Sequence, residues 1–244
     1  MKSKKPITGK CKLCLEVKLL KKSHIYPKFM IRHLRDRKKN DKFVFLTNME
    51  VKAPPQDGPK EHLLCEDCEK KFNLNETYYK EFMLDKKGYE EKDIDKDKFH
   101  ILNYDYNKIR LFLLSLLWRL SVSSIEGWTI KMKSEDQEFL RLLLLLEDPG
   151  KFNEFPFQSF KVFFNAEHTS GVLMNPIESI EPFHDIVLIY ICGIVYRFSK
   201  TKIHSKSFIK VSLTKKQWQV HKKSISNIPL LQNKIVKLLY RNGL

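Results

Sequence analysis

Apolar residues recur at helical spacing in the middle of the chain, and the pattern predicts an amphipathic helix over residues 107–123. Its apolar positions are Ile109, Phe112, Leu113, Leu116, Leu117 and Leu120. A second helix is expected from Ser134, an N-cap residue with Gln137 three positions later, through the run 142–146. Pro149 should end this helix, because proline and the glycine after it favour a turn.

Beyond residue 150 the pattern changes to short runs of β-branched and aromatic residues at 160–164, 186–198 and 208–213. Such runs predict the strands of an antiparallel sheet. A last helix is expected after Pro229. The longest apolar run has about eleven residues, whereas a membrane-spanning helix needs about twenty. No membrane association is therefore expected.

Shorter elements are predicted near the start of the chain. Residues 17–20 could form a strand that leads to His24, and 43–47 reads as another strand. A helix is expected from Pro27 to about residue 38, since proline suits the first helical turn.

A longer helix is expected over residues 65–84, with acidic side chains near its positive end. Along it Glu69, Phe72, Glu76 and Tyr79 fall on one face, so two carboxylates share that face with two aromatic rings. We expect both carboxylates to line the same cleft as His24 if this face meets the preceding strands.

Residues 86–99 form a dense mixed-charge stretch, which predicts a linker or exposed loop. The expected organisation is a basic arm over 1–9, a module over 10–85, the linker over 86–99 and an α+β domain over 100–244. At 244 residues and 42% hydrophobic composition, the chain can bury a core of this size.

The chain is basic, with 45 lysines and arginines against 29 aspartates and glutamates, a formal charge of +16. Residues 1–40 alone hold 14 basic and two acidic residues. A polyanionic partner is therefore favoured, although a solvated basic face would give the same composition. The cations expected to contact nucleic acid are Lys21, Lys22, Lys28, Arg32 and Arg35.

Four of the five cysteines form two Cys-x-x-Cys pairs, Cys11 with Cys14 and Cys65 with Cys68. Two intervening residues let both sulfurs of a pair face one ion, so the spacing predicts a four-thiolate zinc site. Four thiolates leave no open position, and the zinc is expected to be structural. No apolar segment of a secretory signal follows Met1, so the expected compartment is the cytoplasm.

Between these pairs lies Ser23-His24-Ile25-Tyr26-Pro27. A cysteine pair, a His-Ile-x-Pro motif and a second pair after Leu-Leu resemble the HNH endonucleases of the His-Me finger class. The resemblance covers residues 10–84. It extends to an uncharacterised bacterial group of HNH-like proteins that carry Ser-His-Ile-x-Pro-Lys-Phe, Gly-x-Lys-Glu-x-Leu-Leu-Cys and Leu-Ser-x-x-Trp-Arg, found here at 23–29, 58–65 and 114–119.

The resemblance implies a zinc-stapled ββα, treble-clef-like module and a metal-dependent endonuclease that hydrolyses nucleic acid, with DNA the first expectation. It also implies a role in bacterial defence against phages or plasmids. His24 would be the general base that deprotonates water, and Mg²⁺ or Mn²⁺ would absorb charge on the leaving oxygen.

The sequence departs from the family at the expected ligands of that catalytic metal. Ser23 stands where an aspartate or histidine is usual, and Glu69 where a histidine or asparagine is frequent. Glu69 could serve as a hard oxygen ligand, with Glu61 or Glu76 as a further anion. The central asparagine has no clear counterpart, and Lys60 or Glu61 lies nearest to its place.

The alternative is a non-catalytic zinc-finger protein that binds nucleic acid, having lost the ligand at Ser23. A third reading is a protein-interaction scaffold based on the β-rich half. A protein partner or homo-oligomer stays open in each reading. An equal alternative for His24 is a hydrogen-bonded residue that fixes its loop.

Overall fold

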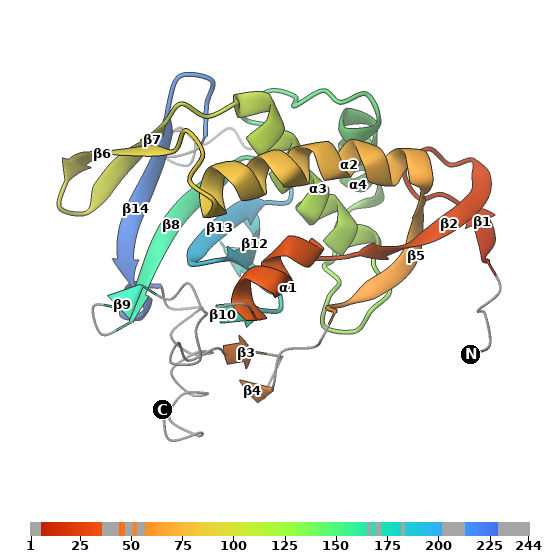
Figure 1. Ribbon diagram of the computed structural model, residues 1–244, viewed down its shortest axis with the longest axis horizontal. Coiled ribbons are helices and arrows are strands. Elements are labelled where there is room, and N and C mark those ends of the chain that lie inside the picture. The colour runs from red at the N-terminus through yellow and green to blue at the C-terminus, as the bar shows by residue number, and fades with distance from the viewer. Residues whose placement is uncertain are drawn as a thin grey trace.

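A computed structural model places the chain in an α+β fold (Figure 1). It describes residues 6–35, 44–46, 51–52, 57–164, 167–168, 172–181, 184–201 and 213–228. The expected helix after Pro229, most of the strand expected at 208–213, and the end of the helix expected to reach residue 38 lie outside these residues.

The N-terminal part alternates short strands with two helices. In chain order its elements are β1 (Thr8–Lys10), β2 (Val17–His24), α1 (Lys28–Arg35), β3 (Val44–Leu46), β4 (Val51–Lys52), β5 (Lys60–Cys65), α2 (Glu66–Tyr79) and the π-helix η1 (Lys80–Leu84). β1, β2 and β5 form an antiparallel sheet with β2 in the centre. The expected strand at 17–20 and the helix at 65–84 are confirmed, the latter with a π-helical last turn.

The basic arm is shorter than predicted, because Thr8, Gly9 and Lys10 pair with β2 as strand β1. The backbone carbonyl of Ile7 also accepts a hydrogen bond from Leu20, 2.8 Å away. The chain is therefore already held to the sheet at residue 7.

Two helices follow, α3 (Tyr106–Val122) and α4 (Ser134–Leu145). The predicted positions are confirmed, but α3 is buried on every side between Ile109 and Leu120 and is not amphipathic. Ser134 is the first helical residue and not the N-cap, which is Lys133. The amide side chain of Gln137 instead donates to the carbonyl of Ser121, 2.6 Å away, so it joins α4 to α3.

All the remaining described strands except β10 form one large mixed sheet. Their bounds are β6 (Glu90–Asp95), β7 (Lys98–Leu102), β8 (Phe157–Phe164), β9 (Glu167–His168), β10 (Val172–Met174), β11 (Ile177–Glu181), β12 (His184–Ile191), β13 (Ile194–Ser199) and β14 (Trp218–Ser224), followed by the 3-10 turn η2 (Ile225–Asn227). The strand order is β11-β12-β13-β8-β14-β7-β6, with β9 beside β8, while β10 pairs with β3. The sheet was predicted to be antiparallel, yet β14 runs parallel to β8.

The charged segment 86–99 is not a loop, because β6 and the start of β7 form an antiparallel hairpin there. Every residue of β6 is exposed, which explains the lack of an apolar signal. Backbone pairing with β7 holds this strand, since burial of its side chains contributes little.

The helix α2 packs on α3 and reaches β13 of the large sheet near its C-terminal end (Figure 1). Tyr79 of α2 stacks on Phe112 of α3 at a centroid distance of 4.1 Å. Its hydroxyl lies 2.8 Å from that of Tyr196 in β13. A contiguous set of buried apolar residues runs from Cys11 to Val220 and so includes both the N-terminal elements and the sheet.

No helix among the described residues is long and apolar enough to cross a membrane.

Candidate functional site

The four paired cysteines come together at one end of the β1-β2-β5 sheet. One sulfur from each of Cys11, Cys14, Cys65 and Cys68 lies within 4.8 Å of all the others. The Sγ atoms of Cys14 and Cys65 are 3.9 Å apart. Tetrahedral zinc with bonds of about 2.3 Å separates its sulfurs by roughly 3.8 Å, so the group is compatible with a structural Zn²⁺.

The backbone around this group is also typical of a metal-binding turn. The amide of Cys65 donates to the sulfur of Cys11 at 3.3 Å, and Leu15 takes a positive φ of 65° as the turn closes. Burial raises the pKa of the Cys68 thiol. A bound cation would offset this cost, because the ligand form of cysteine is the thiolate.

His24 occupies the last position of β2, and its side chain is 20% exposed. Its Nε2 lies 3.2 Å from Oδ1 of Asp57. A carboxylate can only accept, so Nε2 carries the proton and Nδ1 is left with a lone pair. The same Asp57 also pairs with the ammonium of Lys60.

The surroundings of His24 keep its imidazole neutral. Burial, together with the positive charges of Lys60 and Lys28, lowers the pKa of His24 to about 4. Asp57 does not reverse this shift, because its charge is shared with Lys60 and, at 3.9 Å, with Lys28. His24 is thus an uncharged hydrogen-bond acceptor at neutral pH.

The position of Asp57 depends on the glycine that follows it. Gly58 has φ +63, and a Cβ there would lie 3.1 Å from a side-chain carbon of Ile31. The amide of Ile25 donates to the carbonyl of Pro59 at 3.0 Å, which fixes the turn beside β2. Asp57 was not predicted as a site residue, and the Asp-Gly-Pro sequence is the signal that marks this turn.

The two carboxylates predicted on one face of α2 have different environments. Glu76 forms an ion pair of 2.8 Å with Arg119, whose guanidinium also donates to the backbone carbonyl of His24 at 3.0 Å. Oε1 of Glu69 is buried and has no hydrogen-bond partner among the described residues. Burial raises the pKa of Glu76, and the negative charge of Glu69 adds to this rise while it partly opposes the lowering of the pKa of His24, so Glu69 lies within electrostatic reach of both groups.

Ser23 and Glu61 lie on the opposite face of the sheet from His24. Ser23 pairs in register with Glu61, and His24 with Lys60, so side-chain alternation places each pair on its own face. The hydroxyl of Ser23 accepts from the amide of Leu64, and Glu61 binds the amide and hydroxyl of Ser124 at 2.9 and 2.6 Å. The structure does not bring Glu61 to His24, and we leave it out of the proposed site.

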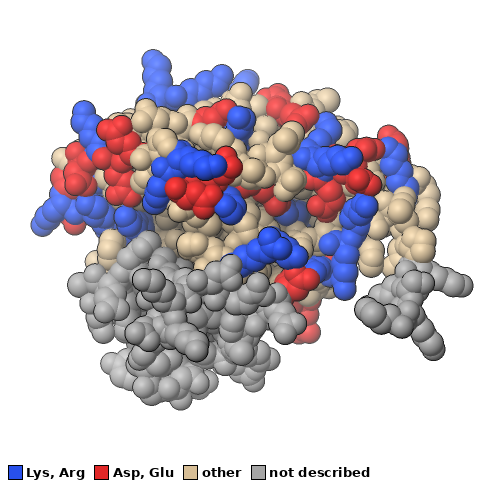
Figure 2. Space-filling view, viewed as in Figure 1, with Lys and Arg blue, Asp and Glu red and all other residues tan. Residues whose placement is uncertain are grey.

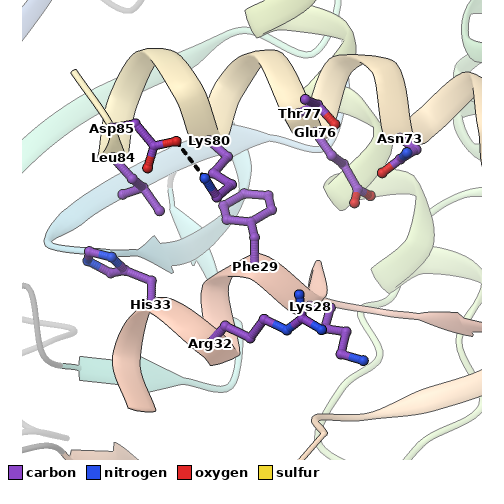
Figure 3. A pocket seen from close by; sticks show the side chains of 10 residues that line it. All are labelled: Lys28, Phe29, Arg32, His33, Asn73, Glu76, Thr77, Lys80, Leu84 and Asp85. Carbon is purple, nitrogen blue, oxygen red and sulfur yellow. Dashed lines mark hydrogen bonds and ion pairs between the residues drawn. The ribbon is translucent and has the colours of Figure 1, made fainter. Parts of the chain in front are cut away.

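The predicted nucleic-acid contacts separate into two groups. Lys21 is paired with Glu66 at 3.2 Å, and Lys22 is exposed on β2. Lys28 and Arg32 extend from α1 into a groove facing α2 (Figure 3). The side chain of Arg35 lies outside the described part of the chain.

Comparisons with protein-family models, curated proteins and solved structures found no match.

Chemical reasoning about the site therefore rests on the geometry above. Among the described residues, the cysteines are the one set of three or more histidine, cysteine or acidic side chains whose ligand atoms gather closely enough to hold an ion. His24 is an uncharged imidazole with an orienting carboxylate, and Glu69, whose charge acts on that imidazole, has a buried oxygen without a partner among the described residues. A divalent cation would satisfy that oxygen.

Proposed function

We propose that this protein is a metal-dependent, HNH-like endonuclease that hydrolyses phosphodiester bonds of nucleic acid. The observation that carries the proposal is His24, a neutral and carboxylate-oriented imidazole at the end of β2, with the charge of Glu69 on α2 near enough to act on it. In this reading β2, β5 and α2 are the ββα module, and the zinc-bound cysteines staple it. The zinc has a structural role, because four thiolates close its shell.

His24 would act as the general base. The carboxylate of Asp57 accepts a hydrogen bond from the Nε2–H group and so fixes the orientation of the ring. This leaves the lone pair of Nδ1 to take a proton from water. A pKa near 4 keeps Nδ1 unprotonated at neutral pH. Lys28 adds positive charge close to this position, where it can attract a phosphate.

Glu69 would supply an anionic ligand for Mg²⁺ or Mn²⁺. Such an ion, when bound, stabilises the charge that develops on the leaving oxygen. Glu76 is committed to Arg119, so its contribution is to hold α2 against β2 and α3. Ser23 is unavailable as a ligand, because its hydroxyl is buried and engaged by Leu64.

The second candidate is a zinc-finger protein that binds nucleic acid without cleaving it. Two observations favour it: Ser23 stands where the HNH family that the sequence resembles usually has an aspartate or histidine ligand, and only the cysteines gather as a metal-binding group among the described residues. This candidate predicts salt-sensitive binding that does not need His24, because cationic contacts release phosphate counterions.

The test is incubation of zinc-loaded protein with supercoiled plasmid and Mg²⁺ or Mn²⁺. His24→Ala is the test variant, and His62→Ala, on the neighbouring strand β5, is the matched control. Zinc content and circular dichroism are measured for both variants, so that loss of the fold is detected separately.

Nicking that needs the divalent ion, survives in His62→Ala and is lost in His24→Ala supports the nuclease. Nicking that persists in His24→Ala would falsify the assignment of the base. Plasmid retention without nicking under any divalent ion favours the binding protein.

A further inference from the structure

A groove of about 720 Å³ lies between α1 and the α2–η1 helix (Figure 3). Phe29 points from α1 across this groove, with Lys28 and Arg32 beside it. Asn73, Glu76 and Thr77 line the opposite wall, and Lys80 and Asp85 line it further along the same helix. The groove meets the His24 site through Lys28, whose ammonium is 3.9 Å from Asp57.

The lining retains positive charge after its internal pairs are counted. Glu76 is neutralised by Arg119 at 2.8 Å, and Asp85 by Lys80 at 2.5 Å. Arg32 has no carboxylate within 4.0 Å among the described residues, and Lys28 only reaches Asp57, which Lys60 already holds.

Lys28 and Arg32 are four residues apart on α1, so their like charges face each other along one side of the helix. Lys and Arg side chains gather over α1 at this place, whereas basic and acidic side chains are interspersed along α2 (Figure 2). A bound phosphate would relieve the repulsion between Lys28 and Arg32 and accept two charge-assisted contacts.

The other groups that line the groove can contact a nucleobase, with an aromatic ring for its face and polar side chains for its edge. The ring of Phe29 packs on Tyr79 and Phe112 at centroid distances of 6.2 and 6.0 Å, which holds it in place as an apolar floor. Asn73 and Thr77 are exposed one turn apart on the facing helix, where an amide and a hydroxyl can bond base edges.

We infer that this groove binds an unpaired stretch of nucleic acid, with a phosphate on Lys28 and Arg32 and a base between Phe29 and the Asn73–Thr77 edge. An aromatic floor beside cations is the arrangement that holds single strands, because an unpaired base exposes its face for stacking. The groove's volume falls within the range of about 300–1,000 Å³ seen for small-ligand sites, which fits one or two nucleotides and not a duplex. The inference rests on the proposed function, because it makes a single-stranded or unpaired segment the substrate that is led to His24.

The test measures fluorescence anisotropy of labelled single strands and of a blunt duplex of equal length. The protein carries His24→Ala and no divalent ion is added, so cleavage cannot change the probe. Arg32→Gln is the test variant. Lys70→Gln is the matched control, because Lys70 lies on α2, is 72% exposed and does not line the groove.

We expect the single strand to bind more tightly than the duplex. Arg32→Gln should weaken single-strand binding about tenfold, because one charge-assisted contact is lost. The slope of log affinity against log salt concentration should fall in magnitude by about 0.7. Lys70→Gln should change affinity less than about twofold. A combined Asn73→Ala and Thr77→Val variant should alter the preference among homopolymeric single strands while keeping the salt slope.

Equal or tighter duplex binding would overturn the inference, as would equal losses in Arg32→Gln and Lys70→Gln. The plasmid assay separates this failure from that of the nuclease proposal. If nicking depends on His24 but Arg32→Gln and Lys70→Gln lose equal single-strand affinity, only the groove proposal is rejected. If Arg32→Gln alone loses affinity and no nicking is seen, only the nuclease proposal is rejected.

Discussion

At His24, a nearby carboxylate and nearby cations act in opposite directions on one imidazole. Asp57 orients the ring, but Lys60 and Lys28 offset its negative charge, and burial disfavours the imidazolium. The result is an oriented ring without a charge. A general base needs both properties, because it must face the water and have a free lone pair.

The low pKa of His24 can be measured by NMR on selectively labelled histidine, with His24→Asn used to assign its signal. We expect the signal to stay at its neutral position from pH 8 down to about pH 5.5 and to move only toward pH 4. A midpoint near 6.5 would show that burial and the neighbouring cations do not lower the pKa of His24.

The same shift links His24 to stability. Its folded pKa is below the unfolded value of about 6.5, so its contribution is complete above pH 6.5 and is lost as pH falls toward 4.

Glu69 and Glu76 provide a matched comparison seven residues apart on α2. Glu69→Gln should change the free energy of unfolding by less than about 1 kcal/mol, because its buried Oε1 has no partner to lose. Glu76→Gln should cost about 3 kcal/mol, because it leaves the buried charge of Arg119 unpaired. Denaturant unfolding measures both.

Glu69→Gln, which should hardly change stability, should have a large effect on nuclease activity. Glu69→Gln should lower divalent-dependent activity about a hundredfold if this carboxylate binds the catalytic ion. Unchanged activity in Glu69→Gln, with the fold intact, would remove Glu69 from the site.

At the scale of elements, the cysteine group and Arg119 hold β2 from its two ends. The cysteines join the turn before β2 to the end of β5 and the start of α2. Arg119, from α3, contacts both Glu76 and the carbonyl of His24 at the other end of β2. The position of the imidazole therefore depends on three elements that are far apart in sequence.

Removal of the metal should loosen this end of the fold. In hydrogen exchange, chelation is expected to raise exchange rates in β1, β2 and β5 more than in β12 and β13, because the ligands lie only in the first group of elements. Equal exchange rates before and after chelation would show that the cysteine group does not stabilise the sheet.

At the scale of the whole molecule, the formal charge of +16 favours polyanions, while ion pairs neutralise many surface lysines. Lys28 and Arg32 differ from these paired lysines because they line a groove and keep positive charge there. Charge alone would give binding without specificity, whereas the groove, if it binds as proposed, would give one strand a defined place close to His24.

Binding of nucleic acid should therefore weaken with salt. Raising monovalent salt from about 50 to 200 mM should lower affinity by about tenfold or more, corresponding to a few released counterions. A titration of single strands by anisotropy measures this slope. Absence of any nucleic-acid binding at low salt would point instead to a scaffold whose partners are proteins.

The sequence by itself determined what depends on local spacing. The two Cys-x-x-Cys pairs predicted the metal-binding group, because two intervening residues suffice to direct both sulfurs. Apolar periodicity located α3, and β-branched runs located β8, β12 and β13, because side-chain periods of 3.6 and 2 follow from backbone geometry. An acidic first turn indicated α2, and an N-cap pattern followed by a leucine run indicated α4.

Only the tertiary structure decided which distant groups meet. The partnership of His24 with Asp57 depends on a turn 33 residues later. Glu61 faces away from His24 because of strand register. The strand β6 forms in a charged segment, and β14 joins β8 in parallel, because backbone hydrogen bonds define sheets and carry no side-chain signal. Such pairings are set by how the chain packs, and local patterns contain no information about them.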